Sequence, residues 1–323
     1  MTLGEPVNTP KPLGKGKAAQ QGPEARMTPF ATLIAGPTAS GKSALAMELA
    51  RASGGIVVNA DSMQVYAGLR VLSARPDAAD EARVPHRLYG FVPPEVEFSV
   101  GRYLEALAPL VAAARAGGPP LVIVGGTGLY FRAMTEGLVP TPTVPEAIRD
   151  LWRAKAAAGE NLHAALTARD PARAEALNPA DTPRLLRAIE IFEATGKPYS
   201  AWLADNPGEA LLQPGEWRGL FLNPPREKVL AAIERRFLTM IEQGALEEVR
   251  ALGAQGLARN LGIMKAHGVP HLLDYLAGNL PLAVAIERGT VDTRRYARRQ
   301  VIFARKYLAG ENWRWISAAN EAV

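Results

Sequence analysis

The sequence predicts an α/β protein with a parallel β-sheet, and three observations support this fold class. Short apolar runs that suit buried strands alternate with helical segments between residues 30 and 131. A glycine-rich phosphate-binding sequence, Gly36–Ser43, follows the first of these runs. A later segment lacks the apolar runs that are typical of strands, and its sequence predicts several short helices. We therefore expect an α/β core of residues 28–140 and 206–323 with C-terminal helices, interrupted by a helical insertion at 141–205.

The predicted strands are short, apolar and rich in strand-forming residues. Phe30–Ala35 comes first, and Ile56–Asn59 and Leu121–Val124 have the same character. Trp217–Leu222 is expected to join the same sheet after the insertion. Because helices connect the strands, their carboxyl ends should meet at one edge of the sheet, where ligands bind in this type of fold.

The predicted helices follow from composition and from the residues that end them. Ser43–Arg51 contains good helix formers and stops at a Ser-Gly-Gly sequence, and a second helix is expected at 104–116. Asp-Pro, Asn-Pro and Gly-Lys-Pro sequences divide the insertion into short helices. A long amphipathic helix should follow Pro225 and end at Gly244, and a basic helix is predicted near 281–309.

Composition excludes several kinds of protein. The chain has 323 residues, no cysteine and a net charge of +5, so disulfides and thiolate zinc sites are excluded, while a polyanionic partner is compatible with the charge. No apolar stretch is long enough to span a membrane. Residues 1–27 are rich in Pro, Gly, Lys and Ala and are predicted to be a disordered basic tail. We expect a cytoplasmic monomer.

Residues 36–43 form a complete phosphate loop, or P-loop, between a predicted strand and a predicted helix. The glycines let successive backbone N–H groups point at an anion, and the helix dipole adds to this field. Lys42 supplies a charge for the terminal phosphates, and Ser43 is placed to ligate a metal ion. A chance glycine turn is the alternative. The phosphate-binding candidates are Gly36, Pro37, Thr38, Ala39, Ser40, Gly41, Lys42 and Ser43.

Asp61 and Thr127 follow the second and third predicted strands. Asp61 faces the ligand edge as a general base or a metal ligand, or it caps the next helix, and its position alone does not separate these roles. The third strand ends in glycines, at Gly125–Tyr130, where an ATPase would have a carboxylate. That argues against nucleotide hydrolysis. These glycines could let a ligand come close to Thr127, or they could form a tight turn between the strand and the next helix. The tight turn is the favoured interpretation.

Basic residues concentrate in Thr290–Lys306, where six arginines and lysines stand against one aspartate. Arg295, Arg298, Arg299 and Lys306 lie close to one stripe of the predicted helix. Contact with a polyanion is the functional interpretation, and a solvated helix face is the alternative. The pair Arg184 and Arg187 in the insertion is open to the same two interpretations.

Six sequence blocks occur in a fixed order along the chain. They are Gly36–Ser43, Asn59–Tyr66, Pro85–Leu88, Gly125–Tyr130, Arg184–Glu190 and Thr293–Gln300. Together they resemble the bacterial tRNA dimethylallyltransferases over residues 30 to 315. The resemblance implies a P-loop NTPase-like core, nucleotide- or ATP-type phosphate binding, Mg²⁺ near Ser43, and tRNA and dimethylallyl diphosphate as substrates. It implies transfer of the dimethylallyl group to the exocyclic amine of the adenosine 3′ of the anticodon.

The resemblance also implies roles for individual residues. The loop at 36–43 would hold diphosphate, Arg236 would help to bind it, and Asp61 would take the proton from the adenosine amine. Thr127 would contact tRNA near the reacting base. The remaining residues implied to line the tRNA site are Ser62, Met63, Gln64, Pro183, Arg184, Leu185, Leu186 and Arg187, to which the basic helix adds Arg295 and Arg299.

Three alternatives remain open at the level of the sequence. One is a small-molecule phosphotransferase that uses the same loop, and another is an isopentenyltransferase acting on free adenine nucleotides. The third is an RNA-binding NTPase without transfer activity. The absence of a carboxylate after the third predicted strand argues against the phosphotransferase and against the NTPase. The basic helix and the insertion count against a free nucleotide. Residues 262–268 depart from the family pattern, so contacts from this segment are not predicted.

Overall fold

The computed structural model describes residues 28–322, and a six-stranded, entirely parallel sheet forms its centre. The strand order is β3-β2-β4-β1-β5-β6, so β1 is an interior strand. The predicted α/β fold class is thus confirmed. The predicted basic tail, 1–27, lies outside the described residues. The strands are β1 Ala31–Ala35, β2 Ile56–Asn59, β3 His86–Arg87, β4 Leu121–Gly125, β5 Trp217–Leu222 and β6 Trp313–Ile316.

The register of the sheet brings the functional loops together. Ala35, the last residue of β1, pairs with Gly125 of β4 and Phe221 of β5, so these strands end level with one another. The four predicted strands are present, and β3 and β6 were not predicted. β3 has only two residues and both are polar, while β6 follows the basic helix at the edge of the sheet. Neither segment carries a buried apolar run of its own.

Helices cover both faces of the sheet. The helix α1, Lys42–Ser53, packs Leu45 against one face. The other face carries α3, Val100–Arg115, and α4, Gly128–Glu136, with the small helix α2, Ala78–Arg83, beside the sheet. The helix α3 begins four residues before the prediction, because the Ser99 side chain caps it by accepting from the Arg102 N–H.

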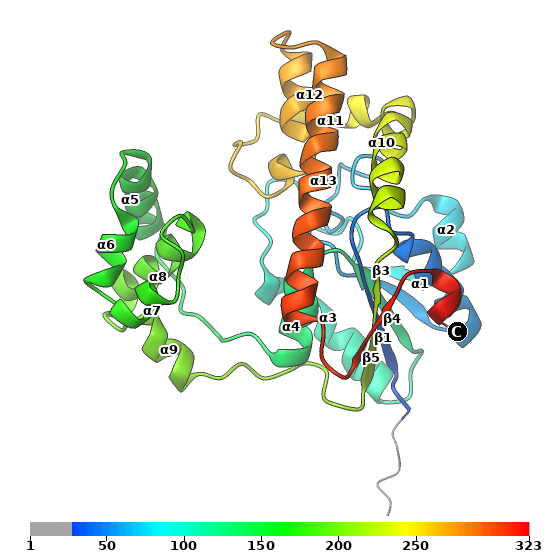
Figure 1. Ribbon diagram of the computed structural model, residues 1–323, viewed down its shortest axis with the longest axis horizontal. Helices are drawn as coiled ribbons and strands as arrows, with labels where there is room; N and C mark the ends of the chain where they lie inside the picture. Colours follow the sequence, from blue (N-terminus) through cyan, green and yellow to red (C-terminus); the bar gives the residue numbers. More distant parts are fainter. Residues whose placement is uncertain (1–27, 323) are drawn as a thin grey trace, which may run out of the picture.

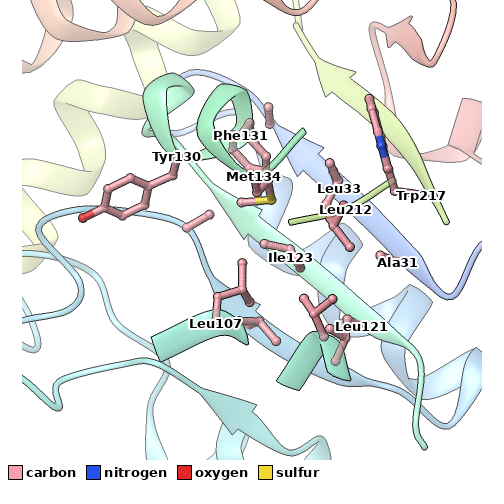
Figure 2. Packing of buried hydrophobic residues seen from close by; sticks show 14 of the residues in the cluster. Ala31, Leu33, Leu107, Leu121, Ile123, Tyr130, Phe131, Met134, Leu212 and Trp217 are labelled. Atoms are coloured by element: carbon pink, nitrogen blue, oxygen red, sulfur yellow. The ribbon is translucent and has the colours of Figure 1, made fainter. Parts of the chain in front are cut away.

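Figure 2 shows the core between the sheet and helices α3 and α4. Leu107, Ile123 and Phe131 are fully buried there, and Met134 packs beside them. Tyr103 stacks on Tyr130 with ring centroids 3.9 Å apart. This packing fixes α4 on the carboxyl end of β4, which positions the glycine-rich turn between them.

The C-terminal helices form a second body above the sheet (Figure 1). They are α10 Arg226–Glu242, α11 Ala245–Gly253, α12 Val269–Leu276 and α13 Leu282–Tyr307. Buried residues of α10, α11 and α12 pack around a loop that follows β2, and Leu69 of this loop is fully buried among them. No helix of the described chain is both long enough and apolar enough to cross a bilayer.

The insertion is a separate group of five helices, joined to the core by two extended segments (Figure 1). Its helices surround a core of their own that includes Trp152, Leu166 and Ile189. Asp170, which is 1% exposed, accepts hydrogen bonds from the Ser200 amide and hydroxyl and so joins two of the helices. The helices are α5 Glu146–Ala157, α6 Leu162–Thr167, α7 Pro171–Glu175, α8 Thr182–Thr195 and α9 Tyr199–Asp205.

Candidate active site

The phosphate loop connects β1 to α1 with the backbone that its sequence predicts. Gly41 has φ +90°, a conformation that favours glycine, and Ala39 at the tip of the loop has φ +64°. A side chain at Gly36 would place a Cβ 2.6 Å from the Leu222 carbonyl oxygen, so this position requires glycine. The Ser40 hydroxyl is buried and has no hydrogen-bond partner among the described residues. A phosphate oxygen would supply that partner.

A cavity of about 470 Å³ opens beside the loop and is also lined by the segment after β2, by helices α10 and α13, and by residues 266–267. Its size is in the range of small-ligand sites. The loop contributes Thr38–Ser43, and α10 contributes Arg236. The other lining residues that matter to the chemistry are Asp61, Met63, Gln64, His267 and Tyr296.

The charges in this cavity favour an anionic ligand. Burial lowers the pKa of Lys42 to about 8, the Asp61 carboxylate opposes that shift, and the Arg236 guanidinium adds to it. Burial also lowers the pKa of Arg236, again opposed by Asp61. Two cations therefore share a desolvated space with one carboxylate. The Lys42 ammonium donates to the Pro37 carbonyl at 3.2 Å, which holds it over the loop.

Asp61 is held in place by its own turn. Its amide donates to the Asn59 side-chain oxygen at 2.8 Å, and the Asn59 amide group donates to the carbonyls of Asp61 and Leu88. The Oδ1 atom of Asp61 accepts from the Met63 N–H at 2.9 Å. Asp61 therefore caps the turn at residues 62–65 rather than a helix, because the next helix begins only at Ala78. It uses one carboxylate oxygen and leaves Oδ2 available to a ligand in the cavity.

Thr127 and Ser62 form a polar cluster beside Asp61. The Thr127 hydroxyl accepts from the Ser62 amide at 2.9 Å and donates to the Ser62 hydroxyl at 3.2 Å. The Tyr296 hydroxyl also hydrogen-bonds with Thr127, and burial raises the pKa of Tyr296. The structure thus brings together residues from α13 and from the segments after β2 and β4, which the sequence places far apart.

The glycines after β4 are explained by close packing of protein against protein. A Cβ at Gly125 would lie 2.0 Å from the Ala60 carbonyl oxygen. At Gly126 it would lie 2.1 Å from the Gln300 Nε2 atom, and at Gly128 2.3 Å from a Phe303 ring carbon. These positions admit the segment after β2 and helix α13, which supports the tight-turn interpretation over close approach of a ligand.

Gln300 is a site residue whose role could not be predicted from the sequence. It is buried in α13, accepts from the Thr38 amide of the phosphate loop at 2.9 Å, and donates to the Gly126 carbonyl at 2.8 Å. One side chain therefore fixes the loops after β1 and β4 relative to each other. The sequence feature that could have identified Gln300 is its spacing, three residues after Ala297 and seven after Thr293, which places it on the buried face of the basic helix.

We predict that Gln300→Ala lowers the free energy of unfolding by about 1–3 kcal/mol, because it leaves a buried amide and a buried carbonyl without partners. Chemical denaturation measures this change, with Gln255→Ala as a matched control on an exposed glutamine. Diphosphate affinity should fall as well, because Thr38 loses its anchor. Equal unfolding free energies for the two variants would contradict the bridging role.

The loop after β2 is held by a carboxylate from α11. Glu248 accepts hydrogen bonds from three consecutive amides, those of Arg70, Val71 and Leu72, at 2.8–3.0 Å. Gln64 closes the same loop by donating to the carbonyls of Ser73 and Ala74, both at 2.9 Å. Gln64 therefore shapes the loop in addition to lining the cavity.

The predicted arginine stripe of α13 divides between two faces of the helix. The Arg299 guanidinium lies 5.7 Å from the centre of the Tyr296 ring. Burial lowers the pKa of His267, and the positive charge of Arg299 lowers it further. Arg299 therefore lies close to two residues that line the cavity. Arg295 is exposed, with Asp292 3.8 Å away. Arg295 and Arg298 both border a hollow between α13 and α10.

The predicted RNA-contacting segment of the insertion, 183–187, lies in the first turns of α8. Pro183 and Arg184 are exposed, and the Arg184 guanidinium pairs with Asp181 at 3.0 Å. Arg187 donates to the Thr141 hydroxyl at 2.6 Å, and Leu186 packs against the insertion core. Leu185 is only 1% exposed inside that core, so its side chain must be removed from the predicted contact set.

Comparison with known proteins gives consistent findings. The family model described as IPP transferase matches residues 64–307, and the model described as isopentenyl transferase matches residues 30–92. A tRNA dimethylallyltransferase of Methylobacterium sp. (strain 4-46) is 52% identical over 290 residues, which are 89% of this chain and 94% of that protein.

Solved structures are similar as well. The tRNA isopentenylpyrophosphate transferase of Bacillus halodurans is 31% identical with a TM-score of 0.62, and the match covers 88% of this chain and 89% of that one. A eukaryotic dimethylallyltransferase, described as acting on tRNA, is 25% identical with a TM-score of 0.72. That match covers 85% of this chain and 69% of the other.

Proposed function

Because the chain belongs to the tRNA dimethylallyltransferase family, we propose that it prenylates tRNA in the cytoplasm, as a monomer. It transfers the dimethylallyl group of dimethylallyl diphosphate to N6 of the adenosine that lies 3′-adjacent to the anticodon, and it releases diphosphate. The observation that carries this proposal is one cavity that combines the phosphate loop, Arg236 and the Asp61 carboxylate, with the Ser62 and Thr127 hydroxyls next to that carboxylate.

The diphosphate end of the donor is proposed to lie on the phosphate loop. The loop amides, Lys42 and Arg236 stabilise the charge that develops on the bridging oxygen as the carbon–oxygen bond breaks. No carboxylate follows β4, and none is needed, because no water has to attack a γ-phosphate. The reaction therefore uses a phosphate loop without the rest of a nucleotide-hydrolysing site.

A Mg²⁺ ion is compatible with the donor set of this loop. Mg²⁺ commonly takes one or two protein oxygens together with substrate phosphates and water. Ser43 is exposed in the first turn of α1 and would supply its hydroxyl, while the buried and unpartnered Ser40 hydroxyl fits a phosphate oxygen beside it. When bound, the ion would neutralise charge on the diphosphate.

Asp61 is proposed to act on the acceptor. As the amine nitrogen forms its bond to the prenyl carbon, its proton passes to the free Oδ2 atom of Asp61, and diphosphate leaves with the electron pair of the broken bond. Thr127 and Ser62 stand next to this carboxylate and would contact the nucleotide. The adenine must leave its stack to reach the cavity, as in other enzymes that modify bases.

The direct test is incubation of the protein with labelled dimethylallyl diphosphate and unmodified tRNA, followed by nucleoside analysis. The proposal requires label on N6 of the adenosine next to the anticodon. Label on free AMP with equal efficiency would support a nucleotide isopentenyltransferase instead. Release of phosphate from ATP without prenyl transfer would support an NTPase.

Arginine contacts should make tRNA binding depend on salt. Arg299 at the cavity and exposed Arg295 are proposed to neutralise RNA phosphates together with Arg184 and Arg187 of the insertion. The double variant Arg295→Ala/Arg299→Ala should weaken tRNA binding and reduce the log–log salt slope by up to about one unit for each lost contact. Fluorescence anisotropy of labelled tRNA at several salt concentrations measures both quantities.

The control for this experiment is Arg51→Ala, an exposed arginine at the end of α1. It should leave the salt slope unchanged, and neither variant should change the affinity of the phosphate loop for dimethylallyl diphosphate. An unchanged slope in the double variant would remove these two arginines from the tRNA interface.

Donor binding should weaken as the pH rises through the pKa of Lys42. Burial places this pKa at about 8, so the ammonium is charged below that pH and neutral above it. A bound diphosphate favours the charged form, so affinity should be constant at lower pH and decline above about 8. Titration calorimetry with dimethylallyl diphosphate measures this, since the terminal phosphate of this ester, with its second pKa near 6, is already ionised there. The Lys42→Ala variant should bind the ligand weakly, and its affinity should not decline above pH 8.

A further inference from the structure

A second hollow, the α10–α13 groove, lies between the N-terminal half of α10 and the C-terminal half of α13. The two helices stand side by side above the sheet (Figure 1). The volume of the groove is about 990 Å³, at the upper end of the range for small-ligand sites. The residues that line it are Pro37, Asn223–Arg226, Val229, Leu230, Arg294, Arg295, Ala297, Arg298, Val301, Ile302, Arg305 and Ser317.

The rim of the groove is strongly cationic. Arg226, Arg298 and Arg305 are exposed and have no ion-pair partner in the part of the chain that the structure describes. Arg294 pairs with Glu234 of α10, but its Nε atom is buried without a hydrogen-bond partner among the described residues. None of the described lining residues is acidic. Arginines at this density suit phosphate oxygens, which they bind in bidentate fashion.

The start of α10 adds to this field. The helix has 17 residues and begins directly after Pro224 and Pro225, and no side chain caps its first amides. Its positive dipole end therefore lies in the same hollow as the arginines. Asn223 and Ser317 contribute further polar groups from the ends of β5 and β6.

The floor of the groove is aliphatic. It consists of Val229 and Leu230 of α10 with Ala297, Val301 and Ile302 of α13, and Ile302 is 55% exposed. No aromatic residue is among the described lining residues, so the groove has no platform on which nucleic-acid bases would stack. A cationic rim above an aliphatic floor matches an amphiphile with a phosphate head and a branched aliphatic chain.

We propose that the α10–α13 groove is a second binding site for prenyl diphosphates, separate from the active-site cavity. The diphosphate head would lie among Arg226, Arg298 and Arg305, and the chain along the aliphatic floor. The choice of an isoprenoid chain rests on the proposed function. The source is either the five-carbon donor or a longer prenyl diphosphate, and the volume favours the longer one.

A thin apolar layer separates this groove from the active site. Val229 and Ile233 of α10 pack with Ala297 of α13 and with Ala39 at the tip of the phosphate loop. Pro37 lines the groove, whereas Thr38–Ser43 line the catalytic cavity. A ligand in the groove would therefore lie directly behind the loop that holds the donor, which makes the groove suited to sensing the supply of isoprenoid diphosphates.

Calorimetry with geranyl diphosphate tests the proposal. The probe is titrated into Lys42→Ala, in which the phosphate loop is disabled, and it should still bind with one equivalent. Adding Arg298→Ala and Arg305→Ala should weaken that binding at least about tenfold, whereas adding Arg51→Ala should not change it. Dimethylallyl and inorganic diphosphate should bind the groove at least about tenfold more weakly than geranyl diphosphate, because they bury less aliphatic surface.

Four results would overturn the proposal. The first is no binding of geranyl diphosphate to folded Lys42→Ala, and the second is binding that the groove substitutions leave unchanged. The third is equal affinity for geranyl diphosphate and inorganic diphosphate, which would mean that the aliphatic floor does not contribute to binding. Loss of tRNA affinity in Arg298→Ala/Arg305→Ala without loss of probe binding would likewise identify the groove as an RNA contact. The calorimetric titrations contain no RNA, so a failure of tRNA prenylation would not imitate the first three results.

Discussion

Asp61→Asn is expected to reduce single-turnover transfer of the dimethylallyl group by roughly 10²–10⁴, the usual contribution of a positioned general base. The substitution removes basicity and keeps size. An asparagine oxygen can still accept from the Met63 amide, so the turn after β2 should keep its shape. Affinity for tRNA should stay within a few-fold. Rapid-quench kinetics with excess enzyme, alongside tRNA binding, separates the two effects.

A matched control for this variant is Asp77→Asn. Asp77 also caps a turn, by accepting from the Asp80 amide at 2.8 Å, but it does so at the start of α2 and does not line the cavity. Its transfer rate should equal that of the wild type. If Asp61→Asn loses tRNA affinity and keeps its chemical rate, Asp61 is a binding residue and the general-base assignment is wrong.

Lys42→Ala is expected to weaken the binding of dimethylallyl diphosphate by roughly 10–100-fold, the value of a lost hydrogen bond to a charged group. Transfer should fall further, because the same ammonium stabilises the leaving diphosphate. Folding should survive, since burial already disfavours the charged form of this side chain. Calorimetric titration with the donor and steady-state transfer measure the two effects.

Lys228→Ala, an exposed lysine in the first turn of α10, is the control for the general loss of a positive charge. Near-normal transfer by folded Lys42→Ala would contradict the assignment of residues 36–43 as the diphosphate site. Reduced transfer in both variants would point to long-range electrostatics rather than to the loop.

The sequence was most informative where a local pattern determines a local structure. The phosphate loop, the four apolar strands and the short helices of the insertion each follow from residues that are neighbours in the chain. Asp61 and Thr127 could be placed at one edge because parallel strands end there. The strands β3 and β6 could not be predicted, since each is short and exists through its pairing with a neighbouring strand.

Other features depend on contacts between distant segments. The glycines after β4 looked like a turn, and only the packing of α13 and of the segment after β2 against them explains why no side chain fits. The arginines of α13 looked like one stripe, and the position of α10 separates Arg298 from Arg299. The role of Gln300 required knowledge of which loops meet beneath the helix.

The bonds that shape the catalytic loops run from one end of the chain to the other. Glu248 holds amides that lie 176–178 positions earlier, and Gln300 holds Thr38 across 262 positions. During synthesis the phosphate loop leaves the ribosome long before the residues that fix it, because domains emerge N-terminus first. A nascent chain that stops before residue 300 therefore carries the complete phosphate-binding motif without a rigid site. Catalytic competence is expected to appear only when the last helix has been made and has docked.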